Sequence, residues 1–96
     1  MLVPVLSKFP RQYKFSLGER MQNQASDVME ILVEAYYSPR DQKKALLARV
    51  NIKIEILRRY IRLAYELGLY SSKVYERLAA LLNEIGRMTG GWLKKL

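Results

Sequence analysis

The chain has 96 residues, of which 50% are hydrophobic and 27% charged, as expected for one globular domain over residues 1–96. Its 17 basic residues outnumber 9 acidic ones, so the formal net charge is +8 and an anionic partner is expected. Cysteine and histidine are both absent, which excludes disulfides, thiolate metal sites and the side chain most used for acid–base catalysis near neutral pH. We therefore expect no catalytic residues, no metal, no cofactor and no small-molecule substrate.

The first six residues are apolar, but they are too few to span a bilayer and lack the basic flank and cleavage site of a signal peptide. No later stretch is both long enough and free of charge. The sequence therefore predicts a cytoplasmic protein with no membrane partner. Residues 1–7 are long enough for about two helical turns, which Pro4 disfavours.

The first long helix is predicted over residues 17–37. Ser16 and Glu19 have the spacing of a capping box at its start. One face of this helix is apolar: Leu17, Met21, Ala25, Val28, Leu32 and Ala35. Its outer side is acidic: Glu19, Asp27, Glu30 and Glu34.

The second helix is predicted over residues 39–67. Ser38 and Pro39 are expected to end the first helix and to start this one, with Ser38 as its cap and Pro39 in its first turn. Apolar residues recur along it at alternating intervals of three and four, which is typical of a bundle seam: Leu47, Val50, Ile54, Leu57, Ile61 and Ala64. Gly68 followed by Leu69 indicates a left-handed helix end with its hydrophobic contact.

The third helix is predicted to begin after Ser71 or Ser72, which can cap it. Seven apolar residues share one face of it: Val74, Leu78, Leu81, Leu82, Ile85, Met88 and Trp92. Polar residues occupy the opposite face: Lys73, Glu76, Asn83, Glu84, Arg87 and Lys94. Gly86, Gly90 and Gly91 are expected either to allow close approach to another helix or to end this helix before Trp92.

A second apolar stripe follows the middle helix on the side away from the seam: Ala45, Ile52, Ile56, Leu63 and Leu67. One interpretation is that neighbouring helices of the same chain cover it. The other is that it forms an oligomer or partner interface, which is attractive for a chain that can bury only roughly 60 to 65% of its unfolded surface. We assign these residues, together with Trp92 as a packing anchor, to an oligomer interface.

The middle helix is also strongly basic. Residues 40–68 hold eight basic and three acidic residues, a net charge of +5, whereas residues 16–37 have a net charge of −3. The predicted nucleic-acid contacts are Lys44, Arg49, Lys53, Arg58, Arg59 and Arg62, of which Lys44 and the last three share one arc. The alternative is a solvated face with ion pairs Glu55–Arg59 and Arg62–Glu66. The seven tyrosines are expected mostly at the bundle rim, although tyrosines can also stack on bases.

Three motifs resemble a known family: residues 8–11 (KFPR), residues 14–20 (KFSLGER) and residues 81–92 (LLNEIGRMTGGW). They are similar to motifs of the four-helix-bundle proteins that include Avd, the accessory variability determinant of diversity-generating retroelements. Ribosomal-RNA intervening-sequence proteins share the fold and parts of the first motif, but the glycine motif ending in tryptophan indicates the Avd branch.

The resemblance implies an all-α, up-down helical bundle of the four-helix type, here with a shortened first helix, that assembles into a ring or barrel, specifically a homopentamer. It implies a non-catalytic accessory protein that binds the retroelement's reverse transcriptase and its template RNA or DNA during mutagenic reverse transcription. Two alternatives remain open at this stage. One is an intervening-sequence-type bundle without a reverse transcriptase partner, and the other is a small helical enzyme of the chorismate-mutase kind.

Overall fold

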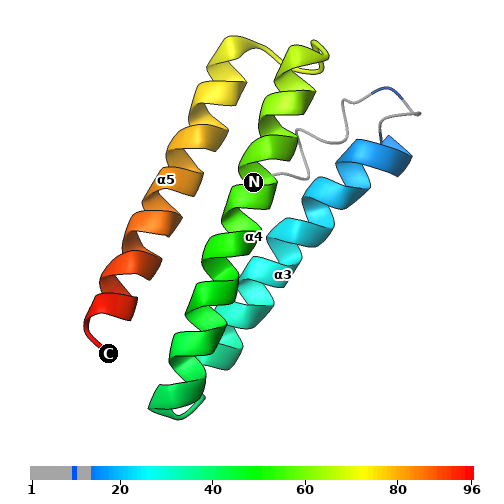
Figure 1. The fold of residues 1–96 in the computed structure, drawn as a ribbon. Helices are drawn as coiled ribbons and strands as arrows, with labels where there is room; N and C mark the ends of the chain where they lie inside the picture. Colours follow the sequence, from blue (N-terminus) through cyan, green and yellow to red (C-terminus); the bar gives the residue numbers. More distant parts are fainter. Residues whose placement is uncertain (1–9, 11–13) are drawn as a thin grey trace.

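Three long antiparallel helices make up the structure, a computed structural model that describes residue 10 and residues 14–96 (Figure 1). They are α3 (Glu19–Tyr36), α4 (Arg40–Glu66) and α5 (Ser72–Lys94), and a π-helical turn, η1 (Lys14–Gly18), leads into α3. All elements within the described ranges are helical, which confirms the all-α fold class. The shortened first helix, predicted within residues 1–7, lies outside the described residues, and the four-helix arrangement and the ring or barrel stay predictions.

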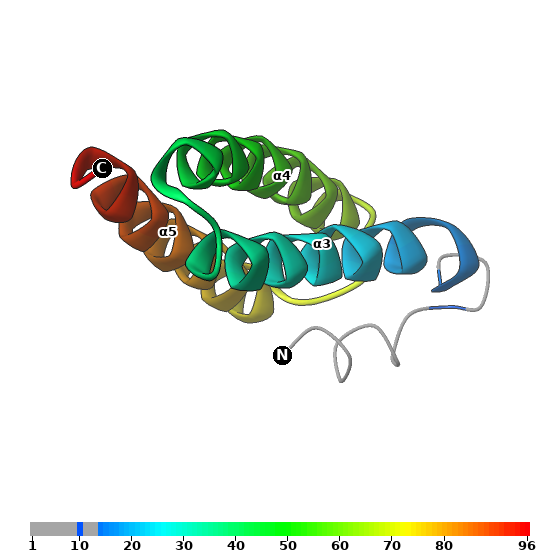
Figure 2. The ribbon, with the colours of Figure 1, turned by 90° about the horizontal axis from the view of Figure 1, so that it is seen from below.

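The middle helix, α4, organises the bundle. It packs against both α3 and α5, which have few contacts with each other (Figure 2). The predicted seam is confirmed, because all six of its residues are at most 2% exposed: Leu47, Val50, Ile54, Leu57, Ile61 and Ala64. Met21 and Val28 of α3 and Leu78 and Leu82 of α5 are buried in the same core. Each large side chain buried in this way stabilises the fold by about 1.5 to 3 kcal/mol before entropic costs.

The start of α3 differs from the prediction. The helical path already begins at Lys14, and Ser16 lies inside the π-helical turn η1. Gly18, directly before α3, has helical dihedral angles (φ −59°, ψ −43°). Ser16 is therefore not the residue that caps α3, and the predicted start at residue 17 is wrong.

The turn between α3 and α4 confirms that the first helix ends at Ser38 and Pro39, but Ser38 does not cap the next helix as predicted. Its hydroxyl donates a hydrogen bond of 2.7 Å to the carbonyl of Glu34, so Ser38 closes the end of α3. Pro39 is extended (φ −60°, ψ 159°) and is the residue before α4, which has no side-chain cap there. Ser38 therefore terminates one helix, and the predicted serine cap of the next helix is wrong.

The turn between α4 and α5 agrees with the prediction. Gly68 has a φ of 74°, and its amide and that of Leu69 donate to the carbonyls of Tyr65 and Ala64, the pattern of a Schellman motif. Leu69 packs against the core, as expected. Ser71 then caps α5 by accepting a hydrogen bond of 3.3 Å from the amide of Val74.

Helix α5 differs from the prediction in two respects. It continues through Gly90 and Gly91 to Lys94, so these glycines do not end it before Trp92. Leu81 and Met88 are 41% and 61% exposed, so only part of the predicted apolar face is buried. Within the described residues, no helix has the combination of length and hydrophobicity that crossing a membrane requires.

Candidate nucleic-acid interface

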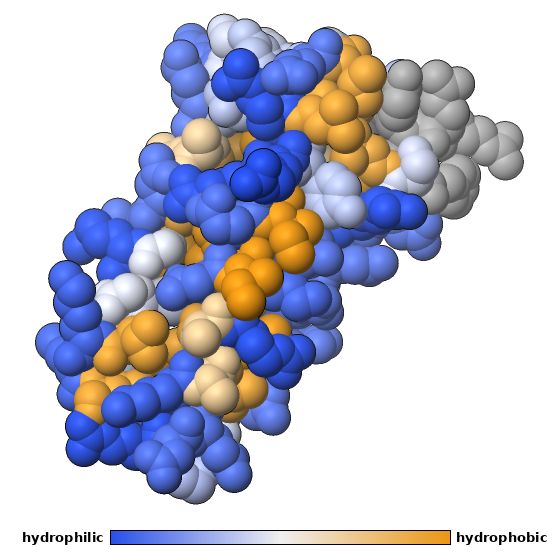
Figure 3. Space-filling model, in the orientation of Figure 1, coloured by the Kyte–Doolittle hydropathy of each residue, from blue (hydrophilic) through white to orange (hydrophobic). Residues whose placement is uncertain are grey.

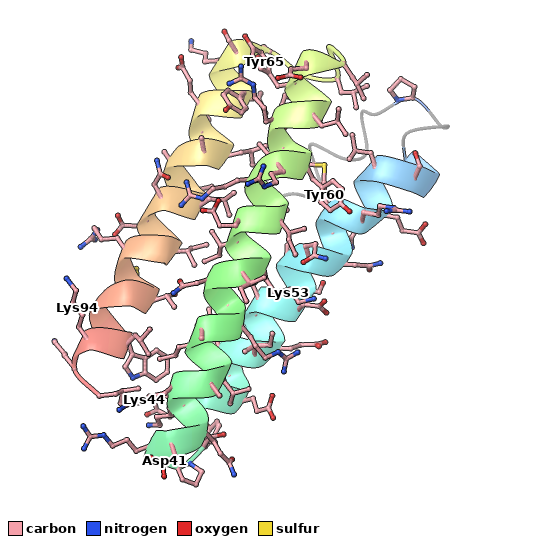
Figure 4. The ribbon with its side chains drawn as sticks, in the orientation of Figure 1. Asp41, Lys44, Lys53, Tyr60, Tyr65 and Lys94 are labelled. Carbon is pink, nitrogen blue, oxygen red and sulfur yellow. The ribbon has the colours of Figure 1, made fainter. Side chains whose placement is uncertain are left out.

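The predicted basic residues of α4 lie on different sides of that helix. Lys53 extends toward α3, where its Nζ is 3.0 Å from Oδ2 of Asp27 (Figure 4). Arg58 extends toward α5, where its guanidinium donates a hydrogen bond to the side-chain oxygen of Asn83. The two residues therefore contact opposite neighbours of the central helix.

Three of the predicted residues line one hollow between α4 and α5. Its volume is about 440 Å³, and Arg58, Arg59 and Arg62 all contribute to its wall. The remaining wall consists of Glu55, Leu63, Glu66 and Tyr75. Residues 58 and 62 are one helical turn apart, and residue 59 follows directly after 58, so three arginine side chains of α4 border one open space. Lys44, Arg49 and Lys53 do not line it.

Arg62 is held at the edge of this hollow by two partners. Its Nε donates to Oε1 of Glu66 at 2.9 Å, which is the predicted ion pair, and its Nη1 lies 3.5 Å from the hydroxyl of Tyr75. Its guanidinium carbon is 5.8 Å from the centroid of the Tyr75 ring. These hydrogen bonds, first to Tyr75 and then to Glu66, raise the pKa of Arg62 above its ordinary value, so the group is always cationic.

Arg58 lies across the face of α5. Its Nε is 3.2 Å from Oε1 of Glu55, close but without the alignment of a hydrogen bond. A Cβ atom at Gly86 would lie 3.4 Å from Nη2 of Arg58, so the glycine lets this side chain pass close to α5. The predicted partner of Glu55 was Arg59, four residues further along the helix. The structure instead pairs Glu55 with Arg58, which is three residues further along.

Arg59 is exposed, and no ion pair or hydrogen bond to it is found among the described residues. The two carboxylates of the hollow, Glu55 and Glu66, are matched by Arg58 and Arg62. The charge of Arg59 is therefore the one in the hollow that no carboxylate there balances. Guanidinium groups in such a position suit bidentate contacts with phosphate oxygens.

Two residues of α5 that were not assigned to the site from the sequence contact its arginines: Tyr75, which lines the hollow, and Asn83, which lies outside it. The sequence predicts Tyr75 only as one of seven tyrosines expected mostly at the bundle rim, and Asn83 only as part of the polar face of its helix. Both contact arginines of α4 that are more than ten residues away in sequence. No spacing within a single helix indicates such a pairing.

The second apolar stripe forms an exposed band along α4, with hydrophilic residues on both sides (Figure 3). Ile52, Leu63 and Leu67 are 61%, 44% and 45% exposed, Ala45 is exposed and Ile56 is half-buried. Neither α3 nor α5 covers the band, so the interpretation that neighbouring helices of this chain cover it does not hold for the described residues. Trp92 lies apart from it.

Trp92 lines a separate, mainly apolar hollow of about 430 Å³ between α3 and α5. Leu32 of α3 and Ile85, Met88 and Thr89 of α5 form the rest of its wall. The Nζ of Lys43 is 5.8 Å from the centroid of the indole ring. In the part of the chain that the structure describes, no group of three or more acidic residues could hold a metal ion.

A family model described as bAvd-like covers residues 1–96 of the chain. No curated protein and no solved structure matches it significantly.

Proposed function

Because this chain belongs to the bAvd-like family, we propose that it is an accessory protein that binds a retroelement's reverse transcriptase together with its template RNA or DNA. Membership of the family indicates an accessory, non-catalytic role in diversity-generating retroelements. The observation that supports nucleic-acid binding most is the hollow in which Arg58, Arg59 and Arg62 converge. The proposed site of action is the cytoplasm.

The electrostatic asymmetry of the chain supports binding through α4. Residues 40–68 have a net charge of +5, whereas residues 16–37 have a net charge of −3. Binding of phosphates by α4 releases condensed counterions from the nucleic acid, which is the main source of affinity in sequence-independent binding. The acidic side of α3 would be turned away from the nucleic acid in such a complex.

The exposed band on α4 supports self-association. It consists of Ala45, Ile52, Ile56, Leu63 and Leu67, and exposed apolar side chains that recur along one side of a helix are typical of an interface between protein chains. In the proposed assembly, a homopentamer, each copy covers most of another copy's band, with Leu63 at the border between this interface and the open arginine hollow. The arginine hollows would then be repeated around the assembly and would strengthen its positive field.

Replacement of Arg58, Arg59 and Arg62 together by glutamine tests the nucleic-acid site. We expect a large loss of RNA affinity and a shallower dependence of log K on log salt concentration, by about 0.7 in the slope for each phosphate contact that is removed. A matched control replaces Lys73, Arg77 and Lys94 of α5 by glutamine, which removes the same charge from exposed positions outside the hollow. Equal losses in the two variants, or no loss in the first, would contradict the assignment.

A further inference from the structure

We propose that the hollow between α4 and α5 holds one unpaired nucleotide of a single strand, with its base stacked against Arg62 and Tyr75 and its phosphate bound by Arg59. This inference rests on the proposed function and makes it more specific. It concerns which form of nucleic acid the hollow accepts and which residues distinguish that form.

A planar platform lies beside the arginines of the hollow. The rings of Tyr65 on α4 and Tyr75 on α5 are stacked, with their centroids 4.6 Å apart and an angle of 11° between their planes. The guanidinium of Arg62 lies next to Tyr75, 5.8 Å from its centroid. Tyr75 and Arg62 both line the hollow, so an aromatic side chain and a planar cation border the same open space.

This platform is held in place before any ligand binds. Tyr65 supports one side of the Tyr75 ring, while Glu66 and the Tyr75 hydroxyl fix the direction of the Arg62 guanidinium. Groups that are already ordered lose less conformational entropy when a ligand binds. Nucleic-acid bases stack on tyrosine rings and on arginine guanidinium planes, and such stacking does not depend on the base sequence.

The charges in the hollow place the phosphate near Arg59. Glu55 and Glu66 also line it and would repel a phosphate, but each is paired with an arginine, at 3.2 Å and 2.9 Å respectively. Arg59 has no such partner within residues 14–96. A phosphate therefore finds the largest uncompensated positive charge at Arg59, beside the platform that would hold its base.

The combination of a stacking platform and a phosphate site selects for an unpaired nucleotide. In a duplex, each base is stacked between its neighbours and presents only its edges, so it cannot lie flat against Arg62 and Tyr75. The apolar side chain of Leu63 forms another part of the wall. A duplex could contact the hollow only through its phosphates, which would bind to the arginines.

The test compares the affinity of the full chain for a 12-nucleotide single-stranded RNA with its affinity for an RNA duplex of the same length. Tyr75→Leu removes the ring. We expect it to weaken single-strand binding by about 5- to 150-fold, the range found when one base-stacking aromatic is removed, and to change duplex binding less than twofold. Tyr75→Phe keeps the ring and should retain most of the single-strand affinity.

Two further variants distinguish an effect on base stacking from an effect on the folded structure. Tyr37→Leu is the matched control, because Tyr37 is 81% exposed and lies outside the hollow, and it should leave both affinities unchanged. Arg62→Lys keeps the charge but loses the planar guanidinium, so it should reduce single-strand affinity several-fold without changing the salt slope. This second variant tests the platform even if Tyr75→Leu fails to fold, which circular dichroism would reveal.

The outcomes distinguish this inference from the proposed function. If Tyr75→Leu and Arg62→Lys weaken single-strand and duplex binding equally, or weaken neither, while the triple arginine variant still loses affinity, the inference is wrong and the proposed function stands. If the wild-type chain binds neither form of RNA, the inference is wrong, and if it also binds no DNA of either form, the nucleic-acid role itself is wrong.

Discussion

Gly68 is the residue at which the chain most depends on glycine, because it ends α4 with a φ of 74°. A side chain in this left-handed region is strained by about 1 to 2 kcal/mol. We therefore expect Gly68→Ala to lower the free energy of unfolding, measured by urea denaturation, by about 1 kcal/mol or more.

Gly91 provides the opposite case. It lies inside α5, and a Cβ there would meet no atom within 4 Å. Gly91→Ala should therefore raise the free energy of unfolding by about 0.5 to 1 kcal/mol, since alanine loses less backbone entropy in a helix. Destabilisation by Gly91→Ala, or no effect of Gly68→Ala, would contradict the assigned helix ends.

Tyr70 gives the chain a dependence on alkaline pH. Its hydroxyl donates a hydrogen bond to the carbonyl of Ile61, and burial, followed by the charge of Tyr75, raises the pKa of Tyr70 above its ordinary value of 10.0. Above about pH 10 the unfolded chain therefore releases this proton while the folded chain keeps it. Stability from Tyr70 is present below that pH and is lost as the pH rises toward the folded-state pKa.

Comparison of the wild type with Tyr70→Phe isolates this contribution. Between pH 8 and pH 11, we expect the free energy of unfolding of the wild type to fall more steeply than that of Tyr70→Phe, because the other titrating groups are common to both. The measurement is the urea midpoint at each pH. Parallel pH profiles of the two proteins would contradict a raised pKa of Tyr70 in the folded chain.

At the scale of the elements, Lys53 and Asp27 connect α4 to α3 with an ion pair of 3.0 Å. Both side chains are partly exposed, so we expect a coupling free energy of only about 0.2 to 1 kcal/mol in a double-mutant cycle of Lys53→Gln and Asp27→Asn. Because Lys53 is paired and Arg59 is not, Arg59→Gln should weaken RNA binding more than Lys53→Gln, although each variant removes one positive charge. A larger loss with Lys53→Gln would contradict the position of the interface.

The sequence predicted the three helices well, because each has a regular apolar spacing that tertiary packing reinforces. All six residues predicted for the seam of α4 are buried. The turn at Gly68 could be predicted because glycine readily adopts a left-handed conformation. The start of α3 was not predictable from its capping box, since the chain enters that helix through a π-helical turn. Ser38 lies between the end of α3 and the start of α4, so its position in the sequence does not show which helix its hydroxyl bonds to.

The candidate site was only half predictable. Arg58, Arg59 and Arg62 could be identified because all three belong to one arc of one helix. The contribution of Tyr75 and Asn83 depends on how α5 packs beside α4, which no periodicity within α5 reveals. For the same reason, the pairing of Glu55 with Arg58 in place of Arg59 became visible only in three dimensions.

At the scale of the whole molecule, the exposed band on α4 should control self-association. We expect Ile52→Gln combined with Leu63→Gln to shift the sedimentation coefficient toward that of a monomer while the far-ultraviolet circular dichroism spectrum remains helical, because both side chains are exposed. Leu57→Ala is a contrasting variant, because Leu57 is in the core and its truncation should cost about 2 to 5 kcal/mol of stability. An unchanged sedimentation coefficient in the band variant would contradict its role as an interface.

The most direct test of the accessory role is co-purification of the tagged chain with the reverse transcriptase of its retroelement, after co-expression, at moderate and high salt. Our account predicts recovery of the polymerase with several copies of this chain, and reduced recovery at high salt or with the Arg58, Arg59 and Arg62 variant if α4 makes the contact. Absence of the polymerase from the eluate, while circular dichroism shows the chain to be folded, would contradict the proposed role.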